Sequence, residues 1–188
     1  MDNATLIGLN AQQALRRRMD LVANNLANMN TTAFKAEVAL NELAVERPSE
    51  AIDEPNDIRF TRIEAVQRDM RTGSLKLTGN PLDLALEEAN AFFTVQAGNE
   101  TFYTRDGSFA MDDLSRLVTR EGQVVLDNAG NEIVFDPEGG PAQISENGTI
   151  RQGQLEIGQL GIVSFEVPAA LEKVSDNLWT PGDQQAAE

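Results

Sequence analysis

The fold of this chain is decided by residues 92–127, FFTVQAGNETFYTRDGSFAMDDLSRLVTREGQVVLD. Short runs rich in β-branched and aromatic residues alternate here with turn-forming pairs such as Gly98-Asn99, Asp106-Gly107 and Glu121-Gly122. Runs of this kind favour β-strands, because branched and aromatic side chains fit a pleated surface and the glycine-containing pairs reverse the chain. The stretch therefore predicts short antiparallel strands joined by tight turns.

The same pattern of β-prone runs and turn residues continues toward the C-terminus. Further β-prone runs follow in the order EIVF, AQIS, TIRQ and LGIVSFEV, the last ending at residue 167. An Asn-Gly pair between strands, as at Asn147-Gly148, favours a type I′ hairpin, because both central residues of that turn need a positive φ. No second long helical pattern interrupts the strands, so we predict a β-rich domain over residues 76–180.

The N-terminal segment has a different period. From residue 3 to about residue 29 there is no proline, and Gly8 is the one glycine. Apolar or small residues recur at the spacing of one face of an α-helix. They are Ala4, Gly8, Ala11, Leu15, Met19, Val22, Leu26 and Met29. We predict one long amphipathic helix whose apolar stripe is covered by other protein chains and not by its own β-rich domain.

A segment without a clear period separates the two parts. Residues 44–59, AVERPSEAIDEPNDIR, are charged and contain Pro48 and Pro55, which is typical of a linker or extended arm. We therefore expect four parts along the chain. They are a helical assembly segment (1–35), a linker or extended arm with a first strand (36–75), the β-rich domain (76–180) and a disordered tail (181–188).

The composition argues against several kinds of chemistry. The 188 residues include 30 acidic and 15 basic side chains, no cysteine and no histidine. Without them the chain has no disulfide, thiolate nucleophile or imidazole base, although carboxylates could still act. A net charge of −15 disfavours nucleic acid and anionic lipid as partners. Since no nucleotide, metal or hydrolase motif is present, we predict no catalytic residue, cofactor, metal or small-molecule substrate.

Four asparagines crowd the predicted end of the helix, in VANNLANMNTTAFK (residues 22–35). Asparagine is unfavourable inside helices because its amide competes for local backbone groups. Termination of the helix accounts for Asn30 and at most Asn28, whereas Asn24 and Asn25 lie too early. The alternative is that these amides bridge to adjacent helices in an assembly.

At this point a family resemblance becomes visible. Residues 6–37, LIGLNAQQALRRRMDLVANNLANMNTTAFKAE, resemble the N-terminal signature of the flagellar rod and hook family, a stretch of the type ANNLANxNTxGFK. TGNPLDLAL, YTRDGSFAMD, LVTREGQVVL, ISENGTI and DNLWTP resemble the continuation of the pattern. Ala33 departs from it by replacing the usual glycine, and EEANA (87–91) lacks the usual glycines before Phe92. The second, C-terminal helix that the family implies is not part of this sequence.

The resemblance implies a mainly β fold with a long N-terminal helix, in which an all-β rod/hook-type domain is joined to the helix by an extended linker. It implies a structural subunit of the bacterial flagellar basal-body rod that polymerises into the axial drive shaft. Its partners would be copies of itself, neighbouring rod subunits and the flagellar type III export apparatus. It would lie in the periplasmic rod and leave the cytoplasm without a cleavable signal peptide, and the sequence shows neither a signal peptide nor an apolar stretch long enough to span a bilayer.

The expected assembly interface combines the apolar stripe with the asparagines and the aromatic residue that follows them. It comprises Leu15, Met19, Val22, Asn24, Asn25, Leu26, Asn28, Met29, Asn30 and Phe34.

Alternatives remain at this stage. Within the family, the opening MDNATLIGLN and the modest β-rich domain resemble the proximal-rod F-type subunits best, followed by distal-rod and hook subunits. An enzyme of a β-rich hydrolase class, using carboxylates such as Asp83 or Asp106, would need a deep pocket with converging acids. A secreted binding or adhesion protein with a helical tether would need a ligand groove on the β-rich domain.

Overall fold

The computed structural model describes residues 3–46, 58–175, 177–182, 184 and 186. Contacts within the chain divide it into two compact units. The first comprises residues 1–31 and 35–69, and the second comprises residues 32–34 and 70–188. The finer division expected from the sequence, into helical segment, arm, β-rich domain and tail, stays a prediction.

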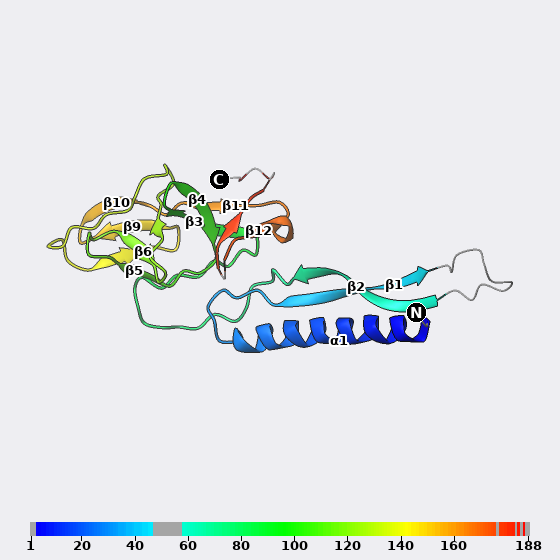
Figure 1. The fold of residues 1–188 in the computed structure, drawn as a ribbon. Coiled ribbons are helices and arrows are strands. Elements are labelled where there is room, and N and C mark those ends of the chain that lie inside the picture. Colours follow the sequence, from blue (N-terminus) through cyan, green and yellow to red (C-terminus); the bar gives the residue numbers. More distant parts are fainter. Residues whose placement is uncertain (1–2, 47–57, 176, 183, 185, 187–188) are drawn as a thin grey trace. The chain divides into compact units, whose positions relative to one another are not determined.

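The first unit is one helix on one hairpin. The helix α1 (Asn3–Ala27) lies along the antiparallel strands β1 (Glu37–Glu46) and β2 (Ile58–Arg68) (Figure 1). Asp69 N donates to Ala36 O at 2.9 Å and closes the open end of the hairpin. The predicted long N-terminal helix is confirmed. Of the segment expected to be aperiodic, 44–46 and 58–59 belong to strands, and 47–57 lie outside the described residues.

The second unit is built of short strands whose pairings are antiparallel. One sheet has the order β12-β13-β4-β3-β7-β6-β5, with β11 also paired to β3, and the other has the order β10-β9-β8. This confirms the mainly β fold class. The strands are β3 (Ala91–Ala97), β4 (Glu100–Thr104), β5 (Phe109–Met111), β6 (Leu117–Thr119), β7 (Val124–Val125), β8 (Ala142–Ile144), β9 (Thr149–Gln152), β10 (Leu155–Gln159), β11 (Ile162–Ser164), β12 (Glu172–Lys173) and β13 (Trp179–Thr180), and η1 (Pro168–Ala170) is a short 3-10 helix.

Strand β3 is the centre of this unit because both of its faces are buried. Successive side chains of a strand point to opposite faces. Phe93 packs edge-to-face on Phe109, with ring centroids 5.0 Å apart, in the larger core cluster. Phe92 packs on Phe165 in a second cluster that also contains Trp179. The sequence pair Phe92-Phe93 thus supplies one anchor to each side of the sheet.

Four turns of the second unit share one hydrogen-bond pattern. In each, the N–H of the fourth residue donates to the carbonyl of the first, and the N–H of the first donates to the carbonyl of the fifth. The fourth residue has a positive φ. The turns are Asp112–Arg116, Thr119–Gln123, Asp127–Asn131 and Ser145–Thr149.

This pattern corrects the expected type I′ hairpin at Asn147-Gly148. Gly148 has φ 77°, but Asn147 is not among the residues with positive φ, so only one residue of the pair is left-handed. The longer hairpin loop, which ends on a left-handed residue, needs that conformation once and not twice. The alternating strand pattern was right about the hairpin and wrong about its turn.

The predicted strand EIVF (132–135) is also wrong. Glu132 and Val134 form isolated bridges to two different partners, Leu126 and Arg116, and no continuous ladder. Ile133 and Phe135 are buried while Val134 is 50% exposed, so the alternation that suggested a strand reflects burial of every second side chain. Strand propensity without a single continuous partner gives extended backbone only.

The segment EEANA (87–91) lacks the family's usual glycines, and its backbone does not require glycine. Among the described residues only Ala33 and Ser115 are non-glycine residues with positive φ, so no left-handed position occurs at 87–91. The buried Arg105 holds this segment instead, donating from Nη1 to the carbonyls of Glu88 (2.8 Å) and Ala91 (2.7 Å). Burial lowers the pKa of Arg105 from its ordinary value.

Candidate assembly surface

One face of α1 is turned toward the hairpin. Its half-buried members are three, four or seven positions apart, which places them on one side of a helix. They are Asn10, Ala14, Leu21 and Asn25, and the half-buried Asn28 follows just after the helix. Since α1 contacts both β1 and β2, this face is the one that packs on the hairpin.

A second face of α1 is apolar and uncovered. Because each residue advances about 100° around a helix, this stripe lies about a third of a turn from the packed face. Its members on α1 are Leu15 (59% exposed), Met19 (72%), Val22 (64%) and Leu26 (65%), and the exposed Met29 (67%) follows in the turn after the helix. Burial of large apolar side chains drives association, so an uncovered row of five is unusual for an element that has no further partner. Four of the five apolar residues expected at the interface lie on it, and the fifth, Met29, is in the turn that follows α1.

The asparagines of the predicted interface differ in what their side chains contact. Asn24 and Asn30 are exposed. The side chain of Asn28 bonds locally, since Nδ2 donates to Asn24 O at 3.0 Å and Oδ1 accepts from the Thr31 hydroxyl at 3.2 Å. Asn28 therefore stabilises the last turn of the helix.

Asn25 has a partner far along the chain. Its Nδ2 donates to Glu37 O at 2.9 Å, and its Oδ1 accepts from Glu37 N at 3.0 Å. The Glu37 carboxylate is also bonded by Arg68 Nε at 3.3 Å. Sequence reasoning noticed that Asn25 lies too early to end the helix, but it did not find this partner within the chain. A role of Asn25 toward neighbouring chains stays a prediction.

Phe34, the last residue of the predicted interface, belongs to the second unit. It is half-buried, and Lys173 Nζ lies 5.7 Å from the centroid of its ring. This is the distance of a cation–π contact. Nine of the ten predicted residues thus lie on α1 and the turn that follows it, and Phe34 belongs to the second unit.

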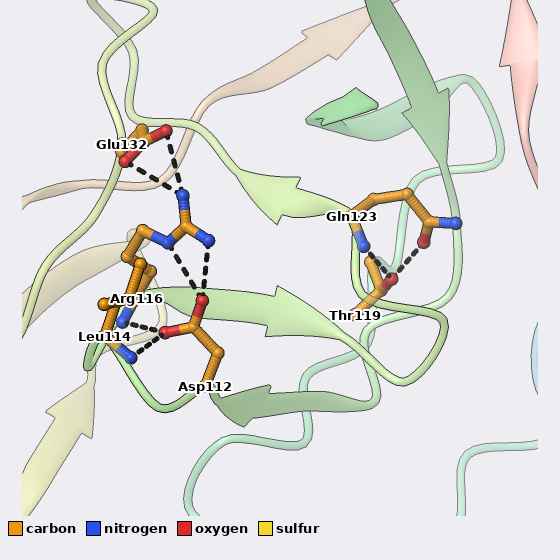
Figure 2. Close-up of polar contacts among 6 residues, drawn as sticks. All are labelled: Asp112, Leu114, Arg116, Thr119, Gln123 and Glu132. Atoms are coloured by element: carbon orange, nitrogen blue, oxygen red, sulfur yellow. Dashed lines mark hydrogen bonds and ion pairs between the residues drawn. The ribbon is translucent and has the colours of Figure 1, made fainter. Parts of the chain in front are cut away.

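The polar clusters of the β-rich unit stabilise turns (Figure 2). Asp112 accepts hydrogen bonds from the backbone N–H groups of Leu114 (2.9 Å) and Arg116 (2.8 Å), and its carboxylate is also paired with the Arg116 guanidinium. Glu132 pairs with the same guanidinium at 3.3 Å. The hydrogen bond from Arg116 N is the main cause that lowers the pKa of Asp112, and the bond to Asp112 raises the pKa of Arg116.

A similar side-chain contact closes the next turn. Gln123 N donates to Thr119 Oγ1 at 3.2 Å, and the Thr119 hydroxyl donates to Gln123 Oε1 (Figure 2). At the third turn, burial would raise the pKa of Asp127, but hydrogen bonds from Asn131 and Ala129 outweigh it and the net shift is downward. The polar side chains of these turns are therefore engaged in holding the turns in which they lie.

Neither carboxylate considered for a hydrolase lines either of two depressions on the described part of this unit. One, of about 400 Å³, is lined by residues including Arg116 and Glu132, and the other, of about 230 Å³, by residues including Thr119. Asp83 accepts from Asn80 Nδ2 at 2.8 Å, and Asp106 from Ser108 N at 3.0 Å. Both carboxylates are therefore engaged in holding loops.

In the described part of the chain, no group of three or more acidic side chains is placed to hold a metal ion. The described helices include none that is long and apolar enough to cross a membrane.

Comparisons with known proteins agree with the two-part organisation. Residues 6–35 match the family described as flagella basal body rod protein, and residues 88–165 match the flagellar hook protein FlgE/F/G D1 domain. The first match contains the uncovered stripe of α1, and the second contains most of the β-rich unit.

Individual relatives match along almost the whole chain. The flagellar basal-body rod protein FlgF of Caulobacter vibrioides is 38% identical over 95% of this chain and 73% of its own length. FlgF of Mesorhizobium japonicum is 34% identical over 88% of this chain and 66% of its own. The rod protein FlgG of Bacillus subtilis is 27% identical over 92% and 70%. The chain thus spans about two thirds to three quarters of the length of these relatives. The chain thus has the uncovered apolar stripe in its N-terminal match and a β-rich unit in its second match, and its relatives cover nearly its full length. It belongs to the flagellar basal-body rod protein family.

Proposed function

We propose that this protein, by its family a structural subunit of the bacterial flagellar basal-body rod, enters that assembly through the uncovered stripe of α1. The proposal is supported by the exposure of Leu15, Val22 and Leu26 on a helix whose half-buried face already packs on the hairpin of the same chain. In this proposal the helix supplies the adhesive surface of the subunit.

The energetics of the stripe favour association. Removing a large apolar side chain from water contributes roughly 1.5–3 kcal/mol, so five such residues form a strong seam once a partner covers them. Much of that gain is offset by ordering costs and lost freedom on binding. Assembly would then be favoured at a growing tip, where several contacts form together.

The same proposal covers the partners and the location. Copies of the chain and neighbouring rod subunits would cover the stripe, within the part of the basal body that crosses the periplasm. Export through the flagellar type III apparatus belongs to the same proposal. In this proposal torque is carried by packing, and no chemical step is required.

The test replaces stripe residues in the full chain, in a strain that lacks the native gene. Val22→Ser and Leu26→Ser, singly and together, should leave the soluble protein folded and reduce incorporation into isolated basal bodies, with loss of swimming in the double variant. Leu114→Ser is the matched control, since Leu114 is equally exposed (66%) but lies in the β-rich unit. Normal basal bodies and swimming with the double variant would refute the proposal.

A further inference from the structure

One segment of the β-rich unit has the pattern of a strand but has no strand beside it. Residues 74–78, SLKLT, alternate polar and apolar side chains, which is the period of a half-buried strand. The whole segment is exposed, with Leu75 at 62% and Leu77 at 97%. Among the described residues, none forms a backbone-to-backbone hydrogen bond with this segment. Pairing with a sheet edge would therefore give it both hydrogen bonds and apolar contacts.

The same unit holds this segment at both ends. On one side, the Thr72 hydroxyl donates to Glu87 O at 3.2 Å. On the other side, Asn80 Nδ2 donates to Asp83 at 2.8 Å, and Leu82 is buried in the larger core cluster. A segment held at both ends loses less conformational freedom on binding than a free tail, so its middle is prepared to pair.

Strand β10 offers a free edge at its first residues. It lies at the end of the sheet β10-β9-β8, and among the described strands it pairs only with β9. Opposite residues of an antiparallel pair alternate between hydrogen-bonded and non-hydrogen-bonded pairs. Only two residues separate Gln152 from its partner Leu155, so this closing pair is bonded, and the next residue, Glu156, points its backbone groups outward. An outward row of this kind is a template for a further strand.

The apolar side chains of the two elements match on one face. Leu155 pairs with Gln152, which lies on the same face of β9 as the buried Ile150, and Leu155 itself is 68% exposed. An antiparallel strand that sets Leu77 opposite Leu155 brings Leu75 beside Ile157, a half-buried residue packed on the larger core cluster. The added strand would thus extend the apolar face of the sheet.

The charged side chains match on the opposite face. The same register sets Lys76 opposite Glu156. Lys76 is exposed, and no described side chain forms an ion pair with it. Glu156 is 62% exposed in its side chain and is held only at 3.5 Å by Arg151, so its carboxylate has room for a second cation. Opposite charges across a strand pair favour this register.

We propose that residues 74–78 of one copy add as an antiparallel strand to the β10 edge of a second copy of this chain. The segment and the edge are both open in the same molecule, so neither is the other's partner within one chain. Each copy carries one segment and one edge, so the contact is head-to-tail and continues as a ring or an open helix. It is separate from the stripe of α1 and rests on the proposed function only in that copies must be neighbours.

The absence of cysteine makes this contact measurable. Variants Leu77→Cys and Leu155→Cys, carrying different epitope tags, are produced together in a strain without the native gene, and isolated basal bodies are oxidised. Directly opposite residues have Cβ atoms about 4.5–5.5 Å apart, which is close enough for a disulfide to form with a small shift. The matched control replaces Leu155→Cys by Leu114→Cys, since Leu114 is 66% exposed in a turn of the same unit.

The expected result is a dimer that carries both tags, at least fivefold more abundant than with Leu114→Cys. Basal bodies that contain both variants but give no more mixed dimer than the control would overturn the strand contact and leave the stripe of α1 as an assembly surface. A disulfide within one chain of the monomeric double variant Leu77→Cys/Leu155→Cys would assign the segment to its own β10 and would also overturn the contact between copies.

Exchange of the charged pair tests the register. Adding Lys76→Glu to the Leu77→Cys chain should lower the yield of mixed dimer at least threefold, because two carboxylates then face each other. Adding Glu156→Lys to the Leu155→Cys chain should restore the yield, since opposite charges face each other again. A yield that Lys76→Glu leaves unchanged would overturn the proposed pairing of Lys76 with Glu156.

Discussion

Asn25 and Glu37 exchange two hydrogen bonds across twelve positions of sequence, Nδ2 to the carbonyl at 2.9 Å and N–H to Oδ1 at 3.0 Å. The pair ties the last turns of α1 to the first residue of β1. An asparagine amide imitates a backbone group in this arrangement, since it offers one donor and one acceptor side by side. The bonds fix the rotation of the helix on the hairpin and so hold the apolar stripe outward.

Replacing Asn25 should loosen the first unit. Asn25→Ala removes both bonds and leaves the backbone groups of Glu37 without this partner, at an expected cost of about 1–3 kcal/mol. Amide hydrogen exchange at α1, β1 and β2 should rise, while exchange in the β-rich unit stays unchanged. Asn24→Ala is the control, since Asn24 is exposed on the neighbouring position and its replacement should change stability by no more than about 0.5 kcal/mol. Equal exchange in the two variants would show that the pair does not hold the helix.

Arg105 should resist even a conservative replacement. Its guanidinium reaches the carbonyls of Leu86, Glu88 and Ala91 and lies 5.5 Å from the Phe92 ring centroid. A lysine ammonium cannot present the same planar fork, so Arg105→Lys should lower the free energy of unfolding by about 2 kcal/mol or more. Urea unfolding gives the value. Arg151→Lys, in an exposed pair with Glu156, should stay within about 0.5 kcal/mol of the parent protein. Similar losses at both sites would contradict the role of Arg105 in holding EEANA.

The turn around Asp112 should make stability depend on acid pH. The pKa of Asp112 is lower in the folded protein than its usual 3.8, mainly because Arg116 N donates to it. A carboxylate of this kind stabilises the fold fully above the unfolded pKa, and the contribution is lost as pH falls through the lower folded pKa. Unfolding free energy measured from pH 6 down to pH 2 should therefore fall less steeply in Asp112→Asn than in the parent. Arg116→Gln should flatten the same region, and an unchanged slope in both would contradict the assignment.

Ser115 offers a site for stabilisation. It has φ 60° as the fourth residue of its turn, where Thr119–Gln123 has Gly122 at φ 89°. A side chain in the left-handed region is strained, and glycine removes the strain at a smaller entropic cost, so Ser115→Gly should stabilise by about 0.5–1 kcal/mol. The reverse change, Gly122→Ala, finds open space but the same strained backbone, and should destabilise by a comparable amount. Thermal unfolding of the two variants checks the pair, and shifts of the same sign would contradict the account.

Much of the fold could be predicted because its signals are local. The helical period of residues 3–29 and the alternation of short β-prone runs depend on neighbouring side chains only. The misjudged elements are those whose outcome depends on distant partners. EIVF has strand-like residues but lacks one continuous partner, and Asn147-Gly148 takes a longer loop because the two strands meet at Ser145 and Thr149.

The candidate assembly surface was likewise predictable only in its local features. The sequence by itself determined that α1 has an apolar stripe, since helical geometry places Leu15, Val22 and Leu26 on one side whatever lies around them. Only the tertiary structure decided which face of α1 is already occupied, that Asn25 bonds to Glu37, and that Leu75 and Leu77 remain uncovered. The physical reason is that burial and hydrogen bonding across a chain depend on which surfaces meet, and one-dimensional periodicity contains no information about that.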